Sequence, residues 1–260
     1  MMSDQERARA ADILMEAERT RTQAVQLSKT FPHIEIEDSY AIQSETTRRK
    51  IAAGRRLIGH KVGLTSKAMQ QSSQIDEPDY GHLLDDMMFQ DGAKVAHANY
   101  SVPRVEPELA FVLGQPLKGP GIGLLDVMRA TEYVVPAIEI IDARVQNPRK
   151  IFDTVADNGA AAGIVIGGRP VRPHDVDLRW VGAVFYRNSE IEETGIAAGV
   201  LGHPAMGIAW LANKVGRFGT VLEPGHIMLS GSFTRPVWAD KGDTLHADFG
   251  PLGAVAVQFV

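Results

Sequence analysis

The chain has 260 residues, of which 44% are hydrophobic and 23% charged, which is the composition of an ordinary globular protein. It contains no cysteine, and this excludes disulfides, thiolate metal sites, iron–sulfur clusters and a cysteine nucleophile. The formal net charge is −5 and the basic residues are scattered, so the sequence favours a small-molecule partner over nucleic acid.

Two helices are predicted at the start of the chain. The first is expected from residue 3 to about residue 28, because Ser3 and Glu6 form a capping-box pattern, and Phe31-Pro32 should end it. The second is expected from an N-cap at Asp38 or Ser39 to Ala53, with Gly54 at the C-cap position. The polar, acidic start does not match a secretory signal, and no apolar run approaches the ~20 residues of a membrane span, so we expect a cytoplasmic protein.

Short β-rich runs separated by glycine and proline follow from about residue 57. Strands are predicted over 110–113, 163–166 and 181–186, and helices over 124–131 and 204–215. These elements lack the regular strand–helix alternation of a doubly wound sheet or a β/α barrel. The sequence therefore predicts an α+β fold.

The domain organisation predicted from this pattern has one soft boundary. A helical N-terminal segment spans 1–60 and a β-rich catalytic domain spans 61–260. Because no repeat or low-complexity linker separates the two parts, a single domain remains an alternative.

Carboxylates interrupt two apolar strands in an unusual way. In the strand predicted over 104–113, the two-residue period places Glu106 and Glu108 on one face, and a second apolar run over 134–144 contains Glu139. Three buried carboxylates would need a positive charge nearby, and they supply the oxygen ligands that suit Mg²⁺ or Mn²⁺. The spacing therefore indicates a candidate divalent-metal site.

An alternative interpretation needs no metal. Glu106 and Glu108 could face solvent from an edge strand marked by Pro107, and Glu139 could pair with an arginine. Spacing alone does not decide between the two interpretations. Asp142 lies on the face opposite Glu139, and we expect it to anchor backbone groups or an arginine.

Two further positions are candidates for acid–base chemistry. Lys61 stands beside Val62 in a short predicted strand, where burial could lower its pKa, although a solvated lysine is the commoner case. Residues 76–81 are predicted to form a turn-rich loop that covers a site, with Asp79 as its catalytic candidate, and a surface loop without chemistry is the alternative.

Other motifs are assigned to structure. Residues 119–123 match no phosphate-binding pattern, and residues 231–234 lack the Gly-x-Ser-x-Gly elbow of a serine hydrolase. His203 and His226 are expected to be hydrogen-bonded structural residues.

Several segments together are specific for one protein family. They are Gly59–Gln70, Glu77–Gly81, Glu106–Glu108, Ile138–Arg144, Phe152–Thr154, Asp157–Asn158 and Gly231–Pro236. On these segments the chain resembles, over nearly its full length, the hydratase and decarboxylase branch of the fumarylacetoacetate-hydrolase superfamily. One departure is the short loop over 145–150, which bears on closure of the site and on selectivity for the distal end of a substrate.

The resemblance implies a fold, an assembly and site roles. The fold would be a distorted β-roll or barrel core, assembled into a homo-oligomer, either a pentamer or a decamer of pentameric rings. The implied positions are Glu106, Glu108 and Glu139 for the metal, Lys61 and Asp79 for acid–base steps, and Ser232 and Thr234 for substrate binding.

The implied reaction is a metal-dependent hydration in meta-cleavage catabolism of aromatic compounds, within homoprotocatechuate degradation. The metal, Mg²⁺ or Mn²⁺, would chelate the C1 carboxylate and 2-oxo oxygen of a 2-hydroxydienoate or 2-oxo-enoate, expected to be 2-oxohept-4-ene-1,7-dioate. Water would then add to give a 4-hydroxy-2-oxo acid. Decarboxylation of a 2-oxo-enedioate at the same metal site, hydrolysis of a carbon–carbon bond and a β-rich binding protein are the alternatives.

The distal end of that substrate is left open by the sequence. Four basic residues are available to meet a second carboxylate, and their spacing does not choose among them. They are Arg104, Arg144, Arg149 and Lys150.

Overall fold

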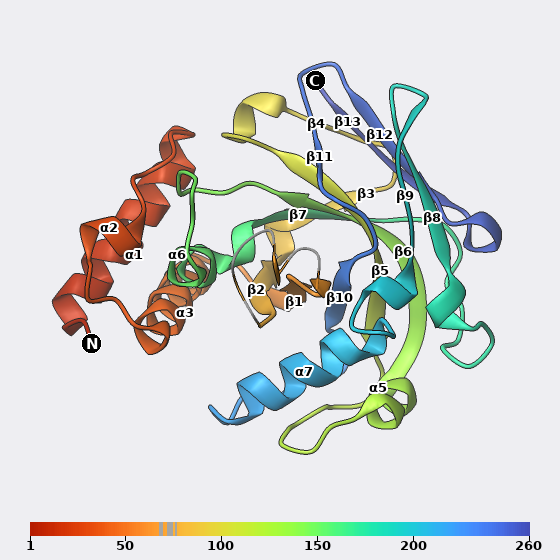
Figure 1. Ribbon diagram of the computed structural model, residues 1–260, viewed down its shortest axis with the longest axis horizontal. Helices are drawn as coiled ribbons and strands as arrows, with labels where there is room; N and C mark the ends of the chain where they lie inside the picture. The colour runs from red at the N-terminus through yellow and green to blue at the C-terminus, as the bar shows by residue number, and fades with distance from the viewer. Residues whose placement is uncertain (68–69, 72–74, 76) are drawn as a thin grey trace.

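The computed structural model describes residues 1–67, 70–71, 75 and 77–260 (Figure 1). Ala68 and Met69 of the family-specific segment, and Asp76 of the predicted cover loop, lie outside the described residues. Among the described residues, no helix is long and apolar enough to cross a membrane.

The helices are few, and several match the prediction. α5 and α7 confirm the helices predicted over 124–131 and 204–215. The described α-helices are α1 (Asp4–Thr20), α2 (Leu27–Thr30), α3 (Ile36–Ala52), α5 (Leu124–Ala130), α6 (Ile151–Ala156) and α7 (Ala205–Gly216). Short 3-10 helices cover Asp85–Met87, His97–Asn99, Asn158–Ala160, Leu178–Trp180, Ala197–Gly199 and Gly250–Leu252.

The first helix begins as predicted but ends early. The capping box is present, since Glu6 N–H donates to Ser3 Oγ at 3.3 Å and the Glu6 carboxylate accepts from Ser3 N–H at 2.8 Å. The expected end near residue 28 is wrong, because α1 ends at Thr20. The chain turns there because Ala24 bonds the segment after β6, accepting from Gln146 N–H at 3.0 Å, and these long-range bonds outweigh local helix propensity.

The second helix begins earlier than predicted. Its N-cap is Glu35 rather than Asp38 or Ser39. Asp38 is instead the third helical residue, and its carboxylate accepts a hydrogen bond from Glu35 N–H at 3.0 Å. Gly54 follows the helix with a φ of +98°, as the C-terminal glycine predicted.

Within the described part of the chain, thirteen strands form two sheets that enclose the main apolar core. The larger sheet has the order β2-β1-β10-β5-β6-β7-β3, with β11 also paired to β5, and the smaller has the order β4-β13-β12-β8-β9. The strands are β1 (Leu57–Gly63), β2 (Asp79–Leu84), β3 (Met88–Gln90), β4 (Ala93–Val95), β5 (Arg104–Leu113), β6 (Thr131–Ile141), β7 (Ala161–Ile166), β8 (Gly182–Arg187), β9 (Glu190–Ile196), β10 (Ile227–Ser232), β11 (Val237–Trp238), β12 (Thr244–Asp248) and β13 (Ala254–Phe259).

The α+β class is confirmed, and so is the location of the predicted strands in β5, β7 and β8. The described strands form open sheets and do not close into a barrel. Figure 1 shows α1, α2 and α3 gathered beside α6 on one side of the β body. An apolar cluster that contains Leu14 and Phe31 also contains Val145 and Ala156, so the first helices pack on the later chain. A domain boundary near residue 60 stays a prediction.

Strand β5 is buried on both faces, and this positions the site. Leu109 and Phe111 point into the core between the sheets, whereas Ala110 packs in a second apolar cluster on the other face. Glu106 and Glu108 precede Ala110 by four and two residues, so their side chains lie on the same face of the strand as Ala110, nearer its start.

Candidate active site

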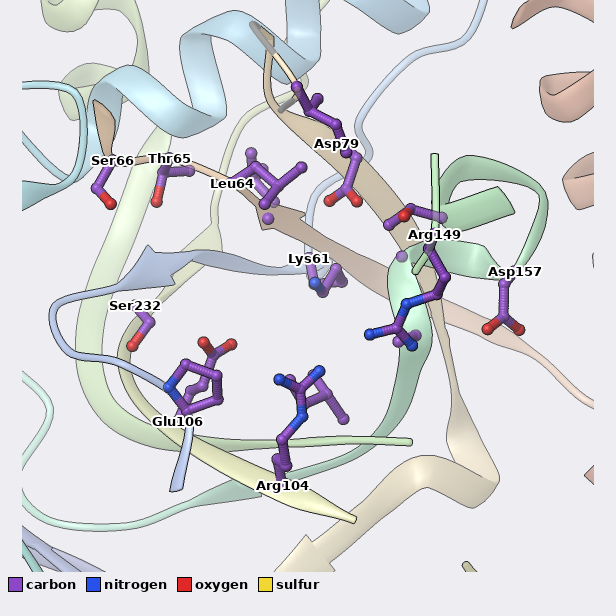
Figure 2. Close-up of a pocket in the computed structure, with 18 of the residues that line it drawn as sticks. Lys61, Leu64, Thr65, Ser66, Asp79, Arg104, Glu106, Arg149, Asp157 and Ser232 are labelled. Carbon is purple, nitrogen blue, oxygen red and sulfur yellow. The ribbon is translucent and has the colours of Figure 1, made fainter. Parts of the chain in front are cut away.

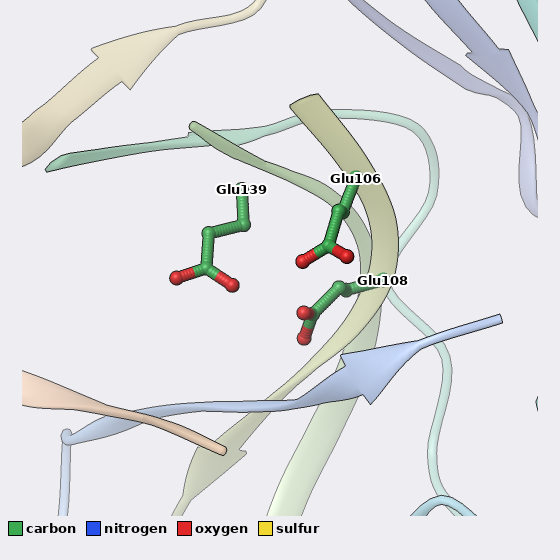
Figure 3. Close-up of side chains that lie close together, drawn as sticks. All are labelled: Glu106, Glu108 and Glu139. Carbon is green, nitrogen blue, oxygen red and sulfur yellow. The ribbon is translucent and has the colours of Figure 1, made fainter. Parts of the chain in front are cut away.

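The three predicted carboxylates meet where β5 and β6 pair. Glu106 lies directly opposite Glu139 in the antiparallel register, and Glu108 lies opposite Ala137. Glu106, Glu108 and Glu139 each offer an oxygen within 4.8 Å of the others, and Figure 3 shows the three carboxylates pointing toward one another. The edge-strand alternative is wrong, because β5 lies between β10 and β6 and both glutamates of β5 face inward.

Several oxygens of these carboxylates are buried without a hydrogen-bond donor to stabilise their negative charge. Glu108 and Glu139 have no solvent exposure, and Glu108 Oε1 and both Glu139 oxygens lack a hydrogen-bond donor among the described residues. Burial raises the pKa of Glu139 to about 7, and burial together with the other two carboxylates raises the pKa of Glu108 well above its usual value. Orphaned buried carboxylate oxygens in this number fit a divalent cation with hard oxygen ligands.

A hydrogen bond from the neighbouring strand β10 binds Glu108, one of the trio of carboxylates formed by Glu106, Glu108 and Glu139. Gly231 N–H donates to Glu108 Oε2 at 2.8 Å. Gly231 has a φ of +111°, and a Cβ there would lie 2.2 Å from Thr65 Oγ1. A glycine is therefore required at this position by the backbone and by the close approach of Thr65.

Lys61 supplies the nearby positive charge. It lies on β1, its side chain is 5% exposed, and its Nζ is 3.5 Å from Glu139 Oε1. The solvated alternative is therefore wrong. The expected fall in its pKa is also wrong, because burial acts in that direction but the attraction of Glu139 and Asp79 outweighs it and raises the pKa of Lys61.

Asp79 is buried beside Lys61 rather than exposed on a loop. It is the first residue of β2, lies opposite Gly63 of β1 and is 2% exposed. The loop interpretation is wrong at this position because strand pairing continues to Asp79, directly after Pro78. A Cβ on Gly63 would lie 2.3 Å from Asp79 Oδ1 and 2.9 Å from Lys61 Nζ, so the glycine allows the two side chains to approach. Burial raises the pKa of Asp79.

A cavity of about 540 Å³ opens beside these groups. Figure 2 shows Lys61, Asp79 and Glu106 facing it from different elements. Ser232 and Thr234 also line it, and Thr234 N–H donates to Ser232 Oγ at 3.2 Å. The structure thus places Lys61, Asp79, Glu106, Ser232 and Thr234 around the cavity, with Glu108 and Glu139 behind Glu106 rather than in the cavity lining.

Sequence reasoning missed part of the cavity wall. Thr65 and Thr154 line the cavity, and their positions within the family-specific segments Gly59–Gln70 and Phe152–Thr154 are the signal that could have identified them. Asp157 also lines it, within a family-specific segment to which no role was given. Its Oδ1 accepts from Arg144 Nε at 2.5 Å, and burial raises the pKa of Asp157 to about 6.

Residues assigned to structure keep that assignment. Asp142 accepts hydrogen bonds from the backbone N–H groups of Ser101 at 2.9 Å and Val102 at 2.7 Å, which confirms its anchoring role. His203 Nδ1 accepts from a backbone N–H at the start of α7 at 3.1 Å, and His226 Nδ1 accepts from another backbone N–H at 3.3 Å.

Comparison with known proteins identifies the class. The model of the fumarylacetoacetate (FAA) hydrolase C-terminal family matches residues 56–260, and the chain belongs to the fumarylacetoacetate hydrolase family. This confirms the resemblance inferred from the motifs.

Within the family, the similarity extends over nearly the whole chain. The chain is 57% identical over 257 residues to 2-oxo-hept-4-ene-1,7-dioate hydratase from Escherichia coli, covering 96% of each protein. It is 39% identical over 259 residues to 2-keto-4-pentenoate hydratase from Paraburkholderia xenovorans, covering 99% of this chain and 96% of that one. The structure of 4-oxalocrotonate decarboxylase from Pseudomonas putida G7, complexed with magnesium and adipate, matches with a TM-score of 0.97 at 34% identity, over 100% of this chain and 99% of that one.

Proposed function

We propose that the chain is a divalent-metal-dependent hydro-lyase that adds water to a 2-hydroxydienoate or 2-oxo-enoate and yields a 4-hydroxy-2-oxo acid. The observation that carries the proposal is the cluster of Glu106, Glu108 and Glu139, in which the two buried members have oxygens without hydrogen-bond donors, next to the cavity that Lys61, Asp79 and Glu106 line. The 57% identity to a 2-oxo-hept-4-ene-1,7-dioate hydratase supports 2-oxohept-4-ene-1,7-dioate as the substrate, within aromatic catabolism by homoprotocatechuate degradation.

The trio would hold the metal, for which we propose Mg²⁺, with Mn²⁺ as the alternative. Three carboxylates leave coordination positions free for a chelating substrate, and a structural relative is described with magnesium. When bound, the metal supplies a Lewis acid that stabilises negative charge on the oxygen of a 2-oxo acid.

The reaction requires protons to move at defined substrate atoms. In ketonisation of the 2-hydroxydienoate, a proton leaves the 2-hydroxyl oxygen and another arrives at C5, which leaves a double bond between C3 and C4. Water then bonds through its oxygen to C4, β to the 2-oxo group, while a proton is added at C3 and one is lost from the water. The net change is the addition of one water molecule.

Lys61 and Asp79 are the groups proposed to move these protons. Both are buried and line the cavity, so water does not compete for them as it would at the surface. Burial raises the pKa of Asp79 and so favours the protonated form of its carboxyl, and the Lys61 ammonium can donate a proton beside the developing oxyanion. Ser232 and Thr234, which line the same cavity, are proposed to bind the substrate.

Carboxylate-to-amide substitutions test the proposal. Glu106→Gln and Glu108→Gln should each abolish Mg²⁺ binding in calorimetry and turnover of a dienoate in an ultraviolet assay. Glu132→Gln, on the exposed part of β6, is the matched control and should retain both. Full turnover by a metal-free Glu106/Glu108 double variant would overturn the mechanism.

Decarboxylation is the second candidate. It is favoured by the 0.97 TM-score to a 4-oxalocrotonate decarboxylase and by 37% sequence identity over 235 residues to another protein of that name from Pseudomonas putida. Release of CO₂ from a 2-oxo-enedioate, without formation of a hydroxy acid, would favour it over hydration.

The family resemblance also supports a cytoplasmic homo-oligomer, either a pentamer or a decamer of pentameric rings. Light scattering after size-exclusion chromatography would give the mass of the assembly.

A further inference from the structure

The contacts and the cavity lining distinguish among the four basic residues that could meet a second carboxylate. Arg144 is committed to structure, because its guanidinium contacts the Asp157 carboxylate and donates to the Ala161 carbonyl at 2.9 Å. Lys150 is exposed and is absent from the cavity lining. Arg104 and Arg149 line the cavity (Figure 2).

Neither of these two arginines has an ion pair or side-chain hydrogen bond within the part of the chain that the structure describes. Arg104 instead lies over the Trp238 ring, with 5.2 Å from its guanidinium carbon to the ring centroid. Figure 2 shows the guanidinium groups of Arg104 and Arg149 directed into the same part of the cavity. Burial and the charge of Arg104 lower the pKa of Arg149.

Two of the three acids near Arg149 are already engaged by other groups, and the third, Asp79, attracts both Arg149 and Lys61. The Asp157 carboxylate binds Arg144, and the Asp153 carboxylate accepts from Ser28 N–H and Ser28 Oγ, both at 2.8 Å. Two guanidinium groups therefore face one cavity, and neither is in ion-pair contact with a carboxylate of the described residues, so the carboxylate of a ligand could bind to both.

The spacing of Arg104 from Glu106 along β5 is comparable with the length of a short diacid. Arg104 and Glu106 share one face of β5, so their Cα atoms are separated by two residues, about 6.7 Å along an extended strand. A seven-carbon chain has six carbon–carbon bonds of about 1.5 Å, which span roughly 7–8 Å when extended. A 2-oxo acid with seven carbons is therefore long enough to reach from the Glu106 end of this face toward the Arg104 end of the same cavity.

We propose that Arg104 and Arg149 form a subsite that binds the distal carboxylate of a 2-oxo-dicarboxylate, and that this subsite selects diacids over monoacids. The inference rests on the proposed function, which gives the first carboxylate its place at the metal site. Arg149 lies in the short loop over 145–150, so this loop contributes to distal selectivity rather than only to closure.

Binding of two saturated analogues tests the subsite without requiring turnover. The ligands are 2-oxoheptanedioate and 2-oxoheptanoate, which have the same chain length and differ only in the distal carboxylate, and both are titrated by calorimetry in the presence of Mg²⁺. The wild type should bind the diacid about 10- to 100-fold more tightly, the range expected for charge-assisted hydrogen bonds. Arg104→Gln and Arg149→Gln should each remove most of this preference while leaving affinity for the monoacid within about threefold.

Three variants serve as controls. Lys150→Gln removes the adjacent charge outside the cavity and should keep the wild-type preference. Arg149→Lys keeps the charge but not the two-pronged donor geometry and should retain part of the preference. Trp238→Ala removes the ring beneath Arg104 and should reduce the preference less than Arg104→Gln does.

Each other outcome overturns the proposal. The subsite does not exist if the wild type shows no preference for the diacid, or if both glutamine variants keep the wild-type preference. It is also ruled out if the glutamine variants lose affinity for the diacid and the monoacid equally. If only one of the two glutamine variants loses the preference for the diacid, the proposal of a site formed by both arginines is overturned. If the wild type hydrates no dienoate, the proposed function fails, but the binding comparison still decides whether the two arginines recognise a distal carboxylate.

Discussion

Replacing Lys61 by methionine separates acid–base chemistry from metal binding. The substitution keeps most of the side-chain volume and removes the ammonium group that lies 3.5 Å from Glu139 Oε1. We expect turnover of the dienoate to fall by about 10²–10⁴-fold, the usual loss for a general acid or base. Binding of Mg²⁺ should be retained, because the carboxylates of Glu106, Glu108 and Glu139 remain in place.

The electrostatic magnitude can be worked from the same contact. At 3.5 Å and an effective dielectric constant of about 20, the attraction between Lys61 and Glu139 is about 5 kcal/mol before desolvation is counted. Breaking a buried ion pair from one side usually costs about 3–5 kcal/mol, because the remaining charge is left unpaired. Here the pKa of Glu139 is already about 7, so a proton can replace the lost ammonium at neutral pH. The free energy of unfolding of the metal-free Lys61→Met variant should therefore fall by less than this usual cost.

Three measurements on one protein preparation check this reasoning. Steady-state ultraviolet kinetics give turnover, calorimetry gives Mg²⁺ affinity, and denaturant titration of the metal-free protein gives the free energy of unfolding. Lys94→Met, at an exposed position of β4, is the control for loss of a surface lysine. Wild-type turnover in Lys61→Met, or loss of its Mg²⁺ binding, would refute the assignment of Lys61 to proton transfer.

Three further predictions concern the fold around the site. Gly231→Ala should lower the melting temperature and weaken Mg²⁺ binding, because its Cβ would meet Thr65 Oγ1 at 2.2 Å, whereas Gly242→Ala, with a φ of +100° and nothing within 4 Å, isolates backbone strain and should cost less. Burial lowers the pKa of His82 to about 4, so its stabilising effect is complete above the unfolded pKa of about 6.5 and falls by about 2 kcal/mol as pH drops from 6.5 to 5. Denaturation across that range should show a smaller dependence on pH in His82→Gln, and an unchanged dependence would contradict the assignment. Asp38→Asn should lower the free energy of unfolding by about 2–3 kcal/mol, since the buried carboxylate accepts from two backbone N–H groups and an arginine, and chemical denaturation would measure the loss.

Local patterns predicted the elements whose signals lie within the chain segment itself. The alternation around Glu106 and Glu108 predicted a strand with both acids on one face, and β5 has that geometry. The end of α1 depended on bonds between Ala24 and the segment after β6, more than a hundred residues later. No helix propensity near residue 24 carries that information.

The pKa shifts in the site also depend on contacts between residues far apart in the sequence. The sequence indicated that Lys61 could be buried, but the sign of its pKa shift depends on how many carboxylates surround it. That number follows from the pairing of β5 with β6 and from the approach of Asp79 across Gly63. Asp79 itself was assigned to a loop because turn-forming residues precede it, whereas the β1–β2 pairing makes it a strand residue. Long-range register therefore determines both its position and its chemistry.

The register of β5 also explains how one strand can orient an asymmetric substrate. Arg104, Glu106 and Glu108 occupy successive positions on one face, so the charge along the cavity wall changes from positive to negative over about two strand steps. A diacid has negative charge at both ends, and a cation at the trio would make both ends of the wall attractive to it. Only its 2-oxo end can offer that cation a carboxylate oxygen together with a neighbouring keto oxygen, so this end should lie near the glutamates and the simple carboxylate near Arg104 and Arg149. Under the proposed function, this orientation would bring C3 to C5 between the two ends, within the cavity that Lys61 and Asp79 line.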